Sequence, residues 1–120
     1  MTGGIPIPMQ PRAVADLAGS LASDKKANRP VLLDLTRLSI MTDYFMIASA
    51  QSRVQATAIA DHIERELKQR DVLPLGKEFD PSGKWLLLDY GSVIVHIFQE
   101  EARQFYNLER LWGEAPLITL

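Results

Sequence analysis

The 120-residue sequence contains no cysteine. This absence excludes disulfide bonds and thiolate zinc sites, and it agrees with a cytoplasmic location, where disulfides are rare. The chain also lacks a surplus of basic residues, because 13 Lys and Arg stand against 15 Asp and Glu. Nucleic-acid binding draws most of its affinity from neutralised phosphates, so RNA is not expected as the main ligand. A protein surface is the better candidate.

Long apolar runs are missing as well. No stretch approaches the roughly 20 apolar residues that a membrane-spanning helix needs. The opening MTGGIPIPMQP has neither the basic start nor the apolar block of a secretory signal. The length and the 47% apolar content are typical of one globular domain. We expect residues 1–10 to be a flexible lead-in, residues 11–116 to form the domain and residues 117–120 to be a C-terminal tail.

Candidate residues for metal or phosphate sites are scarce. His62 and His96 are the only histidines, so a zinc site would need two or more carboxylates beside them. His62 is expected on a solvated helix face. The glycines do not form the Gly-rich loop between a strand and a helix that cradles phosphate. The sequence therefore predicts no metal and no cofactor.

The hydrophobic pattern predicts alternating helices and strands. The expected helices span residues 11–22, 52–70 and 100–112, and the expected strands span 31–36, 44–49, 85–90 and 93–98, with a short edge strand within 74–79. Ser52 and Gln55 at the start of the second helix match a capping box. The order of elements predicts a single α/β domain, with a mixed β-sheet of about five strands and flanking helices.

The segment WLLLDYGSVIVHIF, residues 85–98, predicts a β-hairpin whose loop is Gly91-Ser92, with a positive φ at Gly91. This loop sets the register and pairs Leu88 with Val95. One face of the hairpin is then apolar and faces the core. The other face is expected to be partly exposed, and it carries Trp85, Leu87, Asp89, Ile94, His96 and Phe98.

Asp89 lies diagonal to His96 in this register, at roughly 7 Å. Two interpretations remain open. The residues could be the general acid and base of an enzyme, or they could hydrogen-bond each other or water on a partly exposed sheet face. Ser92 in the turn is not placed to act as a nucleophile. The sequence favours the second interpretation.

The last predicted helix carries a wider apolar arc than one buried stripe needs. The predicted inward set is Phe105, Leu108 and Trp112, and the predicted outward set is Tyr106 and Leu111, joined by Trp85 and Phe98 of the hairpin. An exposed aromatic surface of this kind usually marks a site for a protein partner. Arg103 and Arg110 would supply charged anchors, or would pair with acids on a solvated helix face. The alternative is that all five apolar residues of the helix pack in the core.

Three motifs in series, TDYFMIAS (42–49), WLLLDYGSVIVHIF (85–98) and RQFYNLERLWGEAP (103–116), resemble the ribosomal silencing factors, also called Iojap-like proteins. The helix SRVQATAIADHI (52–63) lies between the first two motifs, as in that family. The resemblance implies a nucleotidyltransferase-like fold without enzymatic activity, and a homodimer. It also implies binding to universal large-subunit protein fourteen where the small ribosomal subunit docks, so that subunit joining is blocked and translation falls when nutrients are short.

We therefore expect a translation repressor that acts by occlusion. The acids Asp34 and Asp89 stand singly on their strands, without the Asp-x-Asp pair that two-metal phosphoryl chemistry requires. The expected partner-binding residues are Asp43, Tyr44, Trp85, Asp89, His96, Tyr106, Glu109 and Leu111. Trp85 is the expected aromatic anchor, while Asp43 fits equally well as a cap of the turn before Tyr44.

Two rival functions remain open from the sequence. One is a degenerate nucleotidyltransferase or small hydrolase that uses Asp89 and His96. The other is a homodimeric scaffold whose exposed aromatic residues serve only the dimer.

Overall fold

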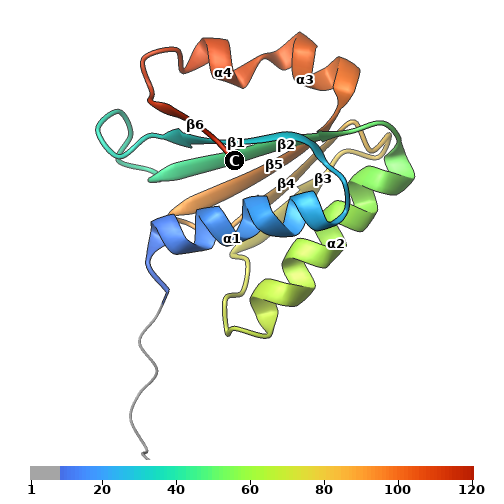
Figure 1. Cartoon of the computed structure of the whole chain (residues 1–120), viewed down its shortest axis with the longest axis horizontal. Helices are drawn as coiled ribbons and strands as arrows, with labels where there is room; N and C mark the ends of the chain where they lie inside the picture. Colours follow the sequence, from blue (N-terminus) through green and yellow to red (C-terminus); the bar gives the residue numbers. More distant parts are fainter. Residues whose placement is uncertain (1–8) are drawn as a thin grey trace, which may run out of the picture.

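A six-stranded mixed sheet forms the centre of the protein in the computed structural model, which describes residues 9–120. The strands are β1 (Asn28–Asp34), β2 (Tyr44–Ala50), β3 (Gly76–Phe79), β4 (Trp85–Asp89), β5 (Val93–Gln99) and β6 (Leu117–Thr119). Their order across the sheet is β3-β4-β5-β2-β1-β6 (Figure 1). Strands β2 and β5 run parallel, and the other neighbouring pairs run antiparallel.

Helices cover both faces of this sheet. Helices α1 (Pro11–Asp24) and α2 (Arg53–Lys68) lie on one face, and the short helices α3 (Glu100–Tyr106) and α4 (Leu108–Leu111) lie on the other (Figure 1). Two clusters of buried side chains result. The larger one lies between the sheet and α1 and α2. The smaller one lies under α3 and α4, around Ile47 and Phe98.

The start of α2 follows from the predicted capping box. The Ser52 hydroxyl accepts a hydrogen bond from the backbone N–H of Gln55 at 3.1 Å, and the Gln55 side chain accepts one from the backbone N–H of Gln51 at 2.8 Å. The bond from Gln55 satisfies a donor that has no partner within the first turn of the helix, and the bond from Gln51 holds the residue just before the N-cap. The apolar face that follows is buried against the sheet, as the sequence predicts.

The register of the β4–β5 hairpin is also confirmed. Leu88 pairs with Val95 and Leu86 with Ile97, and Gly91 in the turn has φ 80°. The face that carries Leu86 and Leu88 packs in the larger core. The opposite face therefore points toward α3, and it holds the residues that form the candidate site.

The structure corrects one expectation about the ends of the chain and does not describe the segment that the other concerns. The sheet has six strands instead of about five, because Leu117–Thr119, within the segment expected to be a tail, pairs with β1 as an antiparallel edge strand. The predicted flexible lead-in, residues 1–10, lies almost entirely outside the described residues.

The last predicted helix is broken at Asn107. This residue has φ 44°, in the left-handed region that asparagine tolerates better than most residues, and its side chain caps α4 by accepting from the backbone N–H of Arg110 at 3.3 Å. The break changes which side chains face inward. Leu108 is buried as predicted, but the prediction that Phe105 faces the core is wrong, because its side chain is 80% exposed.

Candidate functional site

Aromatic side chains gather where the β4–β5 hairpin meets α3. The ring of Trp85 lies 4.9 Å from that of Phe98 and 4.6 Å from that of Tyr106, measured between centroids. Phe105 extends the group, with its ring 5.1 Å from that of Tyr106. We call these four residues, together with His96, the aromatic cluster. Phe98 and His96 form its buried base, whereas Phe105 and Tyr106 are exposed and Trp85 is half-buried.

A hydrogen bond inside the cluster fixes the indole of Trp85. Its Nε1–H donates to Nδ1 of His96 at 3.1 Å. His96 is 4% exposed, and this burial lowers its pKa from 6.5 to about 3. The imidazole is therefore neutral, and its proton sits on Nε2 because Nδ1 is the acceptor. Nε2 has no hydrogen-bond partner among the described residues, and the ring of Phe45 stands edge-on at 4.5 Å between centroids.

Asp89 does not join His96. Its carboxylate accepts a hydrogen bond from the backbone N–H of Gly91 at 2.7 Å and thereby closes the hairpin turn. The sequence placed both residues on the correct face, but the expectation that this face is partly exposed is wrong at His96 and Phe98. Phe98 packs with residues of α3 and α4, and His96 lies among the rings of Phe45, Trp85 and Phe98. The two side chains therefore lack the mutual contact of a general acid and base, and the buried His96 stays neutral.

Burial of neutral His96 predicts a loss of stability in mild acid. The unfolded chain binds a proton near pH 6.5 and the folded chain only near pH 3, so stability is fully present above about 6.5 and falls as the pH drops toward 3. Between pH 7.5 and 5 the wild type should lose about 2 kcal/mol more than His96→Gln. Urea unfolding at a series of pH values measures both curves, and parallel curves would contradict the prediction.

The remaining predicted site residues are dispersed. Tyr44 packs against the larger core, on the sheet face opposite Trp85. Asp43, just before it, is held by backbone bonds to Ser92 at 2.9 Å and to Leu35 at 2.8 Å. Leu111 is 73% exposed on α4, beside a hollow that it lines with Leu38 and Trp112. The structure therefore brings Trp85, His96 and Tyr106 together, and it places the other predicted residues elsewhere.

Glu109 pairs with a buried arginine. The sequence left open that Arg103 or Arg110 pairs with Glu100, Glu109 or Glu114, but it placed such a pair on a solvated helix face. Glu109 forms an ion pair at 3.1 Å with Arg103, whose side chain is 3% exposed. The Arg103 guanidinium also donates to the backbone carbonyls of Asn28 and Arg29 and to the hydroxyl of Ser49, at 2.9–3.1 Å. Arg103 is thus a buried residue of α3 whose hydrogen bonds connect α3 to α4 and to the sheet. The expectation of a charged anchor or a solvated helix arginine is wrong for this residue.

Comparison with known proteins places this geometry in a family. The family model described as "Ribosomal silencing factor during starvation" matches residues 8–120. The chain belongs to this family. It is 35% identical over 112 residues to ribosomal silencing factor RsfS of Bacillus subtilis, and the match covers 93% of this chain and 95% of that protein. It is 36% identical over 99 residues to the chloroplastic protein Iojap of Zea mays, where the match covers 82% of this chain and 43% of that protein.

Solved structures confirm the fold of this family member. A protein from Chromobacterium violaceum superposes with a TM-score of 0.84 at 31% identity, covering 88% of both chains. A second, from Bacillus halodurans, superposes with a TM-score of 0.79 at 32% identity, covering 91% of this chain and 99% of the other. The predicted family and the predicted α/β domain with a mixed sheet are confirmed.

Family membership gives the silencing factor a role in ribosome silencing, and this role suggests a regulator with a ribosomal partner more than an enzyme. Within residues 9–120, no three His, Asp or Glu side chains lie close enough together to hold a metal ion. In the same part of the chain, no helix has the length and apolar character needed to cross a bilayer.

Proposed function

We propose that this chain lowers translation by binding the large ribosomal subunit and blocking its joining to the small subunit. The bound component is universal large-subunit protein fourteen, on the face where the small subunit docks, and the repression operates when nutrients are limiting. The action is steric and has no catalytic step. The protein works in the cytoplasm and forms a homodimer when it is free.

The observation that carries this proposal is the exposed part of the aromatic cluster. Phe105 is 80% exposed and Tyr106 47% exposed, next to the half-buried ring of Trp85. Large aromatic side chains on the surface of a small domain commonly dominate binding to a protein partner. The cluster is also ordered in advance, since the Trp85 N–H is satisfied by His96 and needs no acceptor from the partner.

The charge of the chain supports a protein partner. The formal net charge is −2 and the pI is about 5.6, so the surface has no excess of positive charge for RNA. Ribosomal proteins are typically basic, and a mildly acidic surface favours association with them. An enzyme that uses Asp89 and His96 has no comparable support, because these side chains bond to Gly91 and Trp85 instead of to each other.

Co-sedimentation with separated ribosomal subunits tests the proposal. The protein should pellet with the large subunit and stay in the supernatant with the small one. When it is added before the small subunit, the fraction of joined ribosomes on a sucrose gradient should fall in proportion to the large subunits occupied. If neither subunit carries it down, ribosome binding is wrong for this chain. If it binds the large subunit and joining is unchanged, binding stands and occlusion is wrong.

A further inference from the structure

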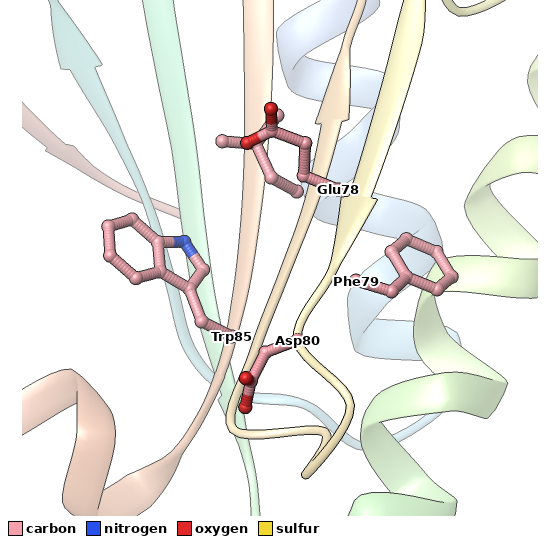
Figure 2. Close-up of a pocket in the computed structure, with 5 residues that line it drawn as sticks. Glu78, Phe79, Asp80 and Trp85 are labelled. Atoms are coloured by element: carbon pink, nitrogen blue, oxygen red, sulfur yellow. The ribbon is translucent and has the colours of Figure 1, made fainter.

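A hollow of about 510 Å³ opens beside Trp85, at the edge of the sheet. Trp85 and Leu87 of β4 line it, together with Glu78 and Phe79 of β3 and Asp80 just after that strand (Figure 2). Glu78 is the cross-strand partner of Leu87, so both side chains project from the face that also carries the aromatic cluster. The hollow is therefore a continuation of the proposed binding surface.

The lining of this hollow combines apolar and acidic side chains. Its five residues include two carboxylates and no basic group. Within residues 9–120, no ion pair involves Glu78. The neighbouring Lys77 points to the other face of the sheet, where its ammonium lies 3.3 Å from the Glu64 carboxylate. The charge of Glu78 thus has no counter-charge in a hollow that the indole of Trp85 also lines.

Asp80 adds a second negative charge at the rim. Its carboxylate accepts hydrogen bonds from the Ser82 hydroxyl and from the backbone N–H of Lys84, and the bond from Ser82 is the main reason that its pKa is lowered. Asp80 is therefore ionised at neutral pH and is held in place by the turn before β4. Its position is fixed, whereas Glu78 is free to reach toward a ligand.

We propose that this hollow receives an arginine side chain from the protein that the chain binds on the large ribosomal subunit, an inference that rests on the proposed function. A planar guanidinium stacks on an indole and can engage carboxylates through two parallel hydrogen bonds. An apolar side chain would remove water from Glu78 without supplying a counter-charge, which is unfavourable. An anionic or phosphate group would be repelled by both acids.

Neutralising Glu78 without changing its shape tests the proposal. Glu78→Gln should bind purified large subunits about tenfold more weakly than wild type, as expected for the loss of one charged hydrogen-bond partner. Glu78→Asp, which keeps the charge, should recover most of this loss. Asp61→Asn is the matched control, because it removes the same charge from an exposed position on α2, across the sheet, and should bind like wild type.

Two further measurements distinguish an ion pair at Glu78 from a purely structural role. If Glu78 only supported the fold, the difference in binding between wild type and Glu78→Gln would not respond to salt or to modification of the large subunit. The difference between wild type and Glu78→Gln should shrink as the salt concentration rises from about 0.1 M to about 0.5 M, because screening weakens the ion pair. Blocking arginines of the large subunit with phenylglyoxal should abolish this difference, whereas acetylating its lysines should leave it.

The outcomes separate this inference from the proposed function. Equal binding of wild type and Glu78→Gln would overturn the arginine site and leave ribosome binding intact. Loss of the difference after acetylation would show that the occupant is a lysine, and the arginine assignment would be wrong. Failure of the wild type itself to bind large subunits would overturn both proposals.

Discussion

Replacing Arg103 with methionine is expected to lower the free energy of unfolding by about 3–5 kcal/mol, the usual cost of breaking a buried charged network by removing one partner. Arg103 is 3% exposed and makes four hydrogen bonds. Its loss leaves two backbone carbonyls and the Glu109 carboxylate without their donor. Urea unfolding followed by circular dichroism measures the change.

A matched variant distinguishes the effect of breaking the buried network from the effect of losing one positive charge. Arg110→Met removes the same type of side chain from an exposed position on α4, and it should change stability by no more than about 0.5 kcal/mol. Arg103→Lys should recover little, because an ammonium group cannot reproduce the fork of donors that reaches both carbonyls and the carboxylate. If Arg103→Met and Arg110→Met unfold at the same urea concentration, the network does not hold α3 and α4 on the sheet.

Trp85→Ala is expected to weaken binding to large ribosomal subunits by about 2 kcal/mol or more, which is about 30-fold. The indole is ordered by its bond to His96 and by the rings of Phe98 and Tyr106, so its apolar surface is presented at little entropic cost. Sedimentation with a dilution series of the protein gives the dissociation constants.

Trp112→Ala serves as the control for this measurement. Trp112 is also half-buried against the smaller core cluster, but its ring lies 6.0 Å from that of Phe45, between centroids, instead of joining the aromatic cluster. Both variants lose a large side chain from the same core layer, and the folded fraction of each is measured first. If Trp85→Ala and wild type bind equally well at the same concentration of folded protein, Trp85 is not part of the interface. If Trp85→Ala breaks the dimer and still binds large subunits at matched dimer concentration, the aromatic residues serve self-association only.

Local signals in the sequence were sufficient for much of the fold. Gly91-Ser92 between two apolar runs fixed the hairpin register, because a two-residue loop leaves one way to pair the strands. Ser52 and Gln55 marked the start of α2 for a similar reason, since the bonds involved span a few residues. The strand Leu117–Thr119 was missed because three residues carry too little periodicity to stand out.

The candidate site depended on contacts that no local pattern encodes. The sequence placed Trp85 and His96 on one face, but the choice of Trp85 over Asp89 as the histidine's partner depends on rotamers and on the cover supplied by α3. The break at Asn107 puts Phe105 and Leu108 on different helices, so they do not share one buried face. The sequence does not show this break, because an asparagine in a helical pattern is compatible with either continuation or a left-handed residue. Arg103 was taken for a surface residue, since its acceptors lie far away in the sequence.

The parallel pairing of β2 and β5 has a consequence for how the chain folds. It joins residues 44–50 to residues 93–99, while the β3–β4 and β4–β5 pairs and the β1–β2 pair are hairpins between sequence neighbours. Hairpins close short loops and form quickly, whereas the β2–β5 junction must close a loop that contains α2, β3 and β4. We therefore expect β1–β2 and β3–β4–β5 to form as local units, and the two long-range pairs, β2–β5 and β1–β6, to complete the sheet more slowly.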